Sequence, residues 1–319
     1  MGKRLSGKVL LIGWDAADWD ILNPLIDAGE MPVFEKLINN GVVGNIATLD
    51  PPISPVLWTS IATGKRADKH GILGFIEPDP VNGGVRPINV TSRKCKALWN
   101  ILHHNKLKCN IIGWWPSYPA EPINGIVVSN YYQKINDRDA EKWNMPNGTI
   151  SIKGSKKELF NLRVHPKEIT GSLLKPFVPD IESINQDEDN RLHGIANILS
   201  QTASIQAAAT WCMRNSDWDF MAVYFDAIDH ACHGYMKYTA PKMNHISDAD
   251  FEIYKDVVKG TYKFHDMMLD RLLELAGEDT TVIIVSDHGF FSDNRRLTTL
   301  PKCNTAPSFE HNPFGIFCI

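Results

Sequence analysis

Short apolar runs along the chain alternate with segments whose apolar residues recur at helical spacing. The run Gly7–Trp14 is apolar almost throughout and predicts a strand, and the segment Ala17–Ala28 predicts a helix. A second helix is expected over Val33–Ile38, with an end near Gly41. The same pattern predicts strands at Val42–Leu49, Lys108–Trp114, Ile126–Ser129, Phe220–Phe225, Thr281–Ser286 and Gly315–Ile319, and helices at Cys95–Asn105, Gly194–Arg214 and Asp248–Ala276.

This alternation predicts an α/β fold with a mostly parallel central sheet that carries helices on both faces, because several of the strands are apolar on both sides. Residues 131–190 are different, since they are rich in charge and are interrupted by several prolines. We expect residues 1–130 and 191–319 to form the core of the fold. Residues 131–190 are expected to be an inserted, irregular cap region, and a solvated connection is the alternative.

The charge balance argues against a surface that binds nucleic-acid polymers. The 319 residues include 33 Lys and Arg against 37 Asp and Glu, which gives a formal net charge of −4. The sequence shows neither an apolar run of the ~18 residues that a membrane span needs nor the pattern of a signal peptide. We therefore expect a cytoplasmic protein without a membrane span.

Acidic and imidazole residues follow three of the predicted strands. Asp15 follows the first strand, Asp226 and Asp229 follow Phe220–Phe225, and the pair Asp287–His288 follows Thr281–Ser286. A single Asp after a strand is usually a helix cap or a turn residue. However, ligands of open α/β sheets bind at the carboxyl ends of the strands, so the joint pattern predicts a site at that edge.

Two Asp/His pairs in this region have a spacing of four residues. Asp229 and His233 would lie on one face of a helix and could bind one metal ion together. Asp226 and His230 have the same spacing, so the sequence leaves both pairs open.

Ser54 and Pro55 have the pattern of a helix start, with the serine as N-cap and the proline in the first helical position. This arrangement fits an ordinary capped helix. It also fits a nucleophile, because the positive potential at a helix N-terminus favours the serine alkoxide and a bound phosphate.

In their order along the chain these motifs resemble the alkaline phosphatase superfamily, and most closely its type I phosphodiesterase/nucleotide pyrophosphatase-like branch. The resemblance implies an alkaline phosphatase-like fold with two metal ions at the strand ends. The residues that carry the resemblance are Asp15, the helix from Ser54 to Gly64, Lys69–Ile72, Asp229 with His233, Ser286–Gly289, and His311 before Gly315–Phe317. By this resemblance, one ion would be held by Asp15, Ser54, Asp287 and His288, and the other by Asp229, His233 and His311.

The chemistry of these residues agrees with that implication. A mixed set of Asp and His ligands suits zinc, with manganese as the alternative. Two divalent ions would balance three carboxylates and a Ser54 alkoxide, which leaves a site that accepts an anionic phosphate. The resemblance thus implies a hydrolase for small-molecule phosphodiesters or phosphomonoesters, with a covalent phosphoserine intermediate at Ser54.

Several alternatives remain open from the sequence. A phosphomutase of the same superfamily would use the same metal chemistry, and a catalytically silent metal-binding module of a larger protein is a second possibility. The pair Asp229/His233 is preferred over Asp226/His230 because Gly234–Met236 follows it with the aromatic character usual in the family. Since His311 lies close to Ile319, we expect a nearly complete catalytic core that belongs to a longer chain with further domains.

Aromatic residues after two strands allow two interpretations. The segments Trp114–Pro116 and Asn130–Tyr132 could line a substrate pocket or pack in the core, and core packing is favoured.

Overall fold

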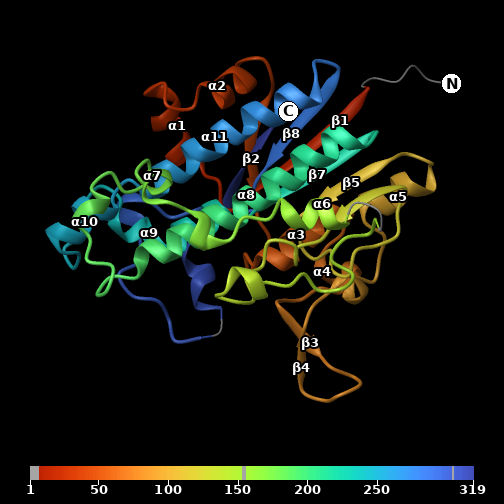
Figure 1. Ribbon diagram of the computed structural model, residues 1–319, viewed down its shortest axis with the longest axis horizontal. Coiled ribbons are helices and arrows are strands. Elements are labelled where there is room, and N and C mark those ends of the chain that lie inside the picture. Colours follow the sequence, from red (N-terminus) through yellow and green to blue (C-terminus); the bar gives the residue numbers. More distant parts are fainter. Residues whose placement is uncertain (1–6, 153–155, 304) are drawn as a thin grey trace.

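Strand β1 (Lys8–Trp14) lies near the middle of a seven-stranded sheet in the computed structural model, which describes residues 7–152, 156–303 and 305–319 (Figure 1). The strand order is β2-β11-β8-β1-β7-β5-β6. Strands β1, β5, β6, β7 and β8 are parallel, whereas β11 is antiparallel to both β2 and β8. The other strands of this sheet are Val43–Ala47 (β2), Cys109–Ile112 (β5), Gly125–Val128 (β6), Phe220–Phe225 (β7), Thr280–Val285 (β8) and Phe314–Cys318 (β11).

Helices cover both faces of the sheet, which places a hydrophobic core on each side. Leu10, Ile12 and Trp14 of β1 face one core. Val9 and Leu11 face the other, as the alternation of side chains along a strand requires. The first core is covered by α1 (Trp19–Asp27), α2 (Pro32–Asn39), α8 (Arg191–Asn215), α9 (Ala227–Tyr235) and α11 (Val257–Ala276), and the second by α3 (Ser54–Thr63) and α5 (Leu98–His104).

Smaller elements surround this framework. A β-hairpin of β3 and β4 projects from the body of the molecule (Figure 1). The short strands β9 and β10 pair antiparallel close to the carboxyl end of β8. Their bounds are Ile76–Pro78 (β3), Val85–Pro87 (β4), Gly289–Phe290 (β9) and His311–Asn312 (β10), and α4 spans Ala67–His70.

The predicted helix Asp248–Ala276 is wrong in one respect, because the structure divides it into α10 (Asp248–Tyr254) and α11. Asp256 occupies the N-cap position of α11, a position that Asp prefers over a helix interior. The Tyr254 hydroxyl donates a hydrogen bond to Asp189 (2.7 Å), which ties the end of α10 to the start of α8.

The described residues of the segment 131–190, which exclude 153–155, form short helices and turns. Leu174, Phe177 and Val178 from this region pack against the first core. The division of the chain into a core and an inserted cap stays a prediction. The elements here are α6 (Lys156–Asn161), α7 (Gly171–Leu174) and the 3₁₀ turns Ala140–Lys142, Pro166–Glu168 and Ile181–Ser183. Among the helices of the described residues, none combines the length and the apolar character needed to cross a membrane.

Helix α3 approaches the central strand very closely at Gly13. A Cβ atom on Gly13 would lie 2.7 Å from Cζ3 of Trp58, well inside van der Waals contact. Trp58 is fully buried and makes edge contacts with Trp114 and Tyr224, at ring-centroid distances of 5.3 and 4.8 Å. A glycine in β1 is therefore required for the packing of α3 against the sheet.

Gly13→Ala should destabilise the protein by about 1–3 kcal/mol, because the added methyl group displaces a fully buried indole. Urea denaturation measures this change. Gly44→Ala in β2 is the control, since a Cβ atom there meets nothing within 4 Å, and it should change the stability by less than about 0.5 kcal/mol. An equal loss in both variants would show that the contact with Trp58 does not matter.

Candidate active site

Three carboxylates follow β1, β7 and β8, which are neighbours in the sheet. Asp15 comes directly after β1, Asp229 lies in the first turn of the helix that follows β7, and Asp287 comes two residues after β8. Because β1 pairs in parallel with both neighbours, the three residues meet at one edge of the sheet. All three are buried, with exposed fractions of 1% for Asp15, 9% for Asp229 and 2% for Asp287.

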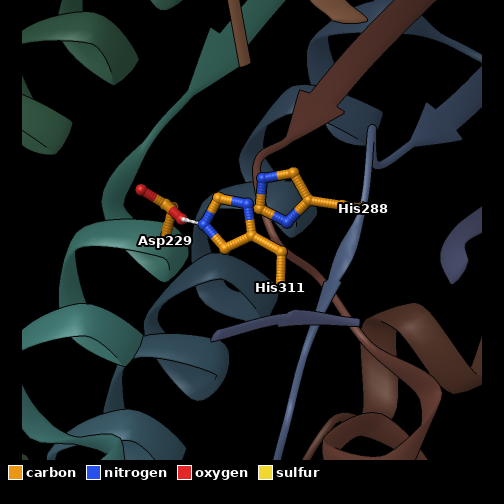
Figure 2. Close-up of side chains that lie close together, drawn as sticks. All are labelled: Asp229, His288 and His311. Atoms are coloured by element: carbon orange, nitrogen blue, oxygen red, sulfur yellow. Dashed lines mark ion pairs between the residues drawn. The ribbon is translucent and has the colours of Figure 1, made fainter. Parts of the chain in front are cut away.

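One cluster of possible metal ligands consists of Asp229, His233 and His311. Oδ1 of Asp229 lies 3.3 Å from Nε2 of His233 and 3.6 Å from Nε2 of His311, and the two Nε2 atoms are 3.1 Å apart. The ring of His288 stacks on His311 with a centroid distance of 3.7 Å, so it borders this cluster (Figure 2). Asp229, His288 and His311 also form a group that could hold a metal ion.

The hydrogen bonds of the histidines turn their Nε2 atoms toward this cluster. Nδ1 of His311 lies 2.9 Å from the carbonyl oxygen of Pro52 and can only donate to it. Nδ1 of His233 lies 2.8 Å from Oε2 of Glu310. If both Nδ1 atoms carry hydrogen, two Nε2 lone pairs face each other at 3.1 Å, which favours a shared proton or a cation between them.

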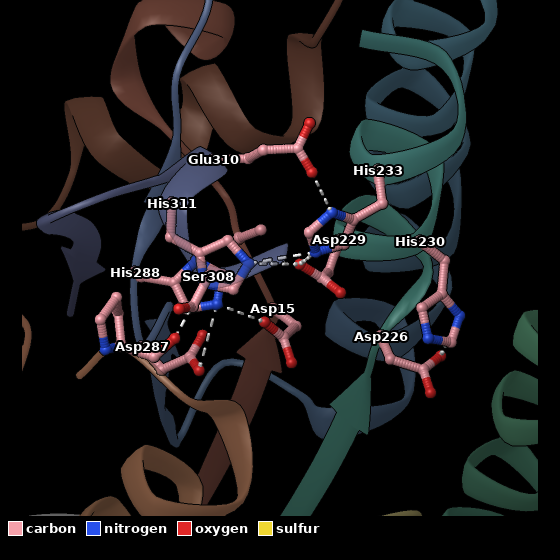
Figure 3. A network of polar contacts seen from close by, with 12 residues as sticks. Asp15, Asp226, Asp229, His230, His233, Asp287, His288, Ser308, Glu310 and His311 are labelled. Carbon is pink, nitrogen blue, oxygen red and sulfur yellow. Dashed lines mark hydrogen bonds and ion pairs between the residues drawn. The ribbon is translucent and has the colours of Figure 1, made fainter. Parts of the chain in front are cut away.

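The second cluster consists of Asp15, Asp287 and His288, whose ligand atoms lie within 4.8 Å of one another (Figure 3). Nε2 of His288 is 3.3 Å from Oδ1 of Asp15 and 3.6 Å from Oδ2 of Asp287. Nδ1 of His288 donates to the carbonyl oxygen of Gly289 at 2.9 Å, so its Nε2 lone pair points at the two carboxylates.

Unpaired polar atoms show that these residues fit metal ions. Within the described part of the chain, five buried atoms of the two clusters have no hydrogen-bond partner, and such atoms are costly to bury. Divalent ions bound by carboxylate oxygens and imidazole nitrogens would satisfy them. The atoms are Oδ1 of Asp15, Oδ1 of Asp229, both carboxylate oxygens of Asp287, and Nε2 of His288.

The pKa values of Asp15 and Asp287 indicate the same need for positive charge, whereas burial of Asp229 is outweighed by the hydrogen bond and charge of His233, which lower the pKa of Asp229. Burial, followed by repulsion from Asp229, raises the pKa of Asp15 to about 7. Burial and the charge of Asp15 raise the pKa of Asp287 well above its usual range. His288 supplies no charge, because burial lowers its pKa to about 3. Bound cations would let both carboxylates ionise at neutral pH.

Neighbouring side chains hold the site residues in place. The Trp58 indole and the Tyr224 hydroxyl both donate to Oδ2 of Asp15, at 3.0 and 2.5 Å, which leaves Oδ1 to face His288. Asp18 accepts hydrogen bonds from the Phe290 amide (3.0 Å) and the Asn312 side chain (2.8 Å), and so clamps the β9–β10 pair beside His288 and His311.

Sequence reasoning missed these supporting residues. Trp58, Tyr224 and Glu310 lie in ordinary helical, strand or loop surroundings, so their spacing carries no signal. Asp18 lies three residues after Asp15 in the same loop, and its position in the first turn of the predicted helix Ala17–Ala28 is the one signal that could have marked it.

Ser54 lies beside the clusters, but one position further into the helix than predicted. Helix α3 begins at Ser54, and Ile53 is the N-cap, because the Ile53 carbonyl already accepts from the amides of Val56 and Leu57 at 2.9 and 3.2 Å. Pro55 is therefore the second helical residue. Ser54 lines a cavity of about 220 Å³ together with Asp15 and Asp229.

The pair Asp226/His230 lies apart from both clusters. It sits on the same helix as Asp229 and His233, yet Nδ1 of His230 is 4.0 Å from Oδ1 of Asp226, and both side chains are partly exposed (Figure 3). Asp226 and His230 line the cavity that contains Ser54. The structure thus brings Asp229 and His233 together with His311 and leaves the alternative pair on the cavity wall.

The aromatic segments divide between the two interpretations. Trp114 and Tyr132 are fully buried in the two cores, as favoured from the sequence. Trp115 and Asn130 instead line the cavity beside Ser54.

The model of the family described as "Type I phosphodiesterase / nucleotide pyrophosphatase" matches residues 9–299. Among solved structures, phosphonoacetate hydrolase from Sinorhizobium meliloti 1021 has 16% identity and a TM-score of 0.53, over 89% of this chain and 56% of that chain. The alkaline phosphatase PafA has 15% identity and a TM-score of 0.59, over 92% of this chain and 64% of that chain.

A third similar structure, murine ectonucleotide pyrophosphatase / phosphodiesterase 5, has 15% identity and a TM-score of 0.46, over 92% of this chain and 60% of that chain. No curated protein gives a significant match. The present chain thus spans less than two thirds of the length of these structures. The likeness to PafA confirms the predicted fold class.

Removing one carboxylate or imidazole from the clusters should lower metal binding. Asp229→Asn and His233→Gln should each reduce the bound zinc by about one ion per chain, because each removes a ligand from the same cluster. Asp226→Asn and His230→Gln are the matched controls on the same helix and should keep the full metal content. Elemental analysis of the purified variants decides between the pairs, and the reverse result would assign the metal to Asp226 and His230.

Metal affinity should increase with pH. In the metal-free protein Asp15 holds a proton below about pH 7. His233 holds one to about pH 10, since the hydrogen bonds and charges of Asp229 and Glu310 outweigh the opposing effect of burial. A bound cation must displace these protons, so zinc affinity should rise by about tenfold or more between pH 6 and pH 8. Titration with chelator-buffered zinc measures this rise, and an affinity that is independent of pH would contradict it.

Proposed function

The chain belongs to the type I phosphodiesterase / nucleotide pyrophosphatase family, a family of phosphoester hydrolases, and from this premise we propose that it hydrolyses small-molecule phosphoesters with two divalent metal ions and with Ser54 as the nucleophile. The proposed ions are zinc, with manganese as the alternative. One would be held by Asp15, Ser54, Asp287 and His288, and the other by Asp229, His233 and His311.

The observation that carries this proposal is the pair of adjoining ligand clusters beside Ser54. Asp15 and Asp229 belong to different clusters, and both line the same cavity as Ser54. Four buried carboxylate oxygens of these clusters lack hydrogen-bond partners in the described chain. A site for positive charge therefore borders the cavity in which a phosphate group would meet the serine.

Divalent ions in these clusters would supply Lewis acidity, which lowers the pKa of a hydroxyl group and neutralises charge on phosphoryl oxygens. Ser54 would attack phosphorus, release the alcohol of the substrate and form a phosphoserine ester. Water would then hydrolyse this ester, with inorganic phosphate as the product from a monoester and an alkyl phosphate as the product from a diester.

The residues of the chain position this reaction. Ser54 is the first residue of the ten-residue helix α3, so the helix dipole favours its alkoxide over its hydroxyl. The close packing of Trp58 under Gly13 fixes this helix to the sheet, and the same indole orients Asp15. His70 also holds helix α3 in place. Its Nε2 lies 3.0 Å from the hydroxyl of Ser60 in α3, and its Nδ1 accepts a hydrogen bond from the Ile72 amide.

Ser54→Ala should lower the turnover of an aryl phosphate ester by about a thousandfold or more and should leave the metal content nearly intact. Release of p-nitrophenolate from mono- and diesters measures the activity. Thr63→Ala removes a hydroxyl from the other end of the same helix, where it donates to the Thr59 carbonyl, and is the control, with an expected change of less than about threefold.

Full activity of the Ser54→Ala protein would refute the nucleophile assignment. Wild-type protein with two bound ions and no hydrolysis over a broad panel of esters would instead indicate a silent metal-binding module.

A further inference from the structure

The cavity beside Ser54 is lined by residues of the metal-ligand clusters and by a second set of residues, which we call its outer part. This outer part is lined by Phe75, Trp115, Gln133, Lys134 and Asp226. The metal chemistry proposed above uses none of these side chains. They are therefore placed to contact the organic part of a phosphoester whose phosphorus lies at Ser54.

Gln133 is the residue of this set with an unmet hydrogen bond. It is 4% exposed, and within the described chain its Oε1 atom is buried without a hydrogen-bond partner. Buried amide groups are usually paired, and an unpaired one raises the free energy of the folded state. A ligand hydroxyl that donates to Gln133 would remove that cost, because the side chain lines the cavity.

The backbone around Gln133 is fixed on both sides. The Asn130 side chain accepts from the amides of Ser117 and Tyr118, at 3.0 and 3.1 Å. On the other side, the Trp143 indole donates to the carbonyl oxygen of Lys134 at 2.8 Å. The backbone that carries Gln133 is thus held in a preorganised position beside the cavity.

The charges at the cavity mouth favour an uncharged group. Lys134 is exposed there and lies over the ring of Tyr131, with Nζ 4.4 Å from its centroid. Asp226 carries the opposite charge on the same cavity wall. Because Lys134 and Asp226 offset each other's charge, this wall gives a ligand of either charge little net attraction, whereas a neutral hydroxyl group can accept from Lys134 and donate to Asp226.

An aromatic wall completes this part of the cavity. The rings of Phe75 and Trp115 lie with centroids 5.3 Å apart, and Phe75 is 54% exposed. Aromatic faces pack well against the C–H groups of a carbon skeleton. The adjacent Gln133 amide can form hydrogen bonds with the hydroxyl groups of that skeleton.

From the proposed function and these contacts, we propose that the outer cavity is a subsite for a neutral polyhydroxyl group, with Gln133 as the specificity-determining residue. The substrate class is a phosphoester of a polyol such as glycerol or a sugar. Gln133 accepts a hydrogen bond from a substrate hydroxyl, and the pair Phe75/Trp115 packs against its carbon skeleton.

Two p-nitrophenyl phosphodiesters, one with a 2,3-dihydroxypropyl group and one with a propyl group, test this subsite, since they differ only in two hydroxyls. Wild-type kcat/KM should favour the dihydroxypropyl ester by about tenfold or more. In the Gln133→Met protein the ratio of kcat/KM for the dihydroxypropyl ester to kcat/KM for the propyl ester should fall to near one. Gln206→Met is the matched control, because Oε1 of Gln206 is also buried and unpaired but its Nε2 bonds Met268 away from the cavity.

A binding measurement separates this proposal from the proposed function. Calorimetry with glycerol 1-phosphate and propyl phosphate on zinc-loaded Ser54→Ala protein should show the same preference, and adding Gln133→Met should abolish it. If neither diester is hydrolysed, the proposed function fails, while the binding preference still supports the subsite. A wild-type ratio near one, equal binding of both ligands, or a preference that Gln133→Met leaves intact would overturn the subsite.

Discussion

Repulsion between three buried carboxylates is the constraint on which the rest of the site depends. Asp15, Asp229 and Asp287 converge because β1 lies between β7 and β8 and because each strand ends in an acidic residue. Hydrogen bonds from Trp58 and Tyr224 reach only one oxygen of Asp15. His233 supplies a positive charge beside Asp229, but burial keeps His288 uncharged next to Asp15 and Asp287, so the fold is built around a space for cations.

The surroundings of the histidines are consistent with that requirement. His288 and His311 each use Nδ1 to donate to a backbone carbonyl, and His233 uses Nδ1 toward Glu310. This leaves the Nε2 atoms for the interior of the clusters. Asp18 connects these segments by hydrogen bonds, because it accepts from Phe290 of β9 and Asn312 of β10 and lies in the loop that carries Asp15. The ligand geometry therefore rests on backbone positions in several separate segments of the chain.

The sequence predicted the sheet well because its strands are short, apolar and followed by polar residues, a pattern that burial on both faces imposes. Phe220–Phe225 was predicted with the bounds that the structure has. Errors arose where local contacts decide between neighbouring residues, as at Ile53, whose carbonyl starts helix α3 one position earlier than predicted. The break before α11 lies at Asp256, which occupies the N-cap position without a side-chain capping hydrogen bond, and a continuous helical pattern conceals it.

The residues of the site likewise fall into those that the sequence could predict and those that it could not. Asp15, Asp229 and Asp287 could be placed together from strand ends alone, since the parallel sheet brings these ends to one edge. Glu310 and Gln133 could not be found, because their roles arise from contacts between distant segments: Glu310 meets His233 across 77 positions of the sequence. Periodicity describes which face of an element is buried, but it holds no information on which loop will cover that face.

The position of β11 has a consequence for how the molecule assembles. In the described sheet β2, at residues 43–47, is bonded to β11 at residues 314–318, which in turn pairs with β8. An emerging chain therefore produces β2 early, but this strand cannot join the sheet until almost all of the intervening sequence has been synthesised. Such non-local pairing slows folding and leaves an unpaired strand exposed in the meantime. Newly made chains should thus spend their most vulnerable period with β2 undocked, at the side of the sheet opposite β5 and β6.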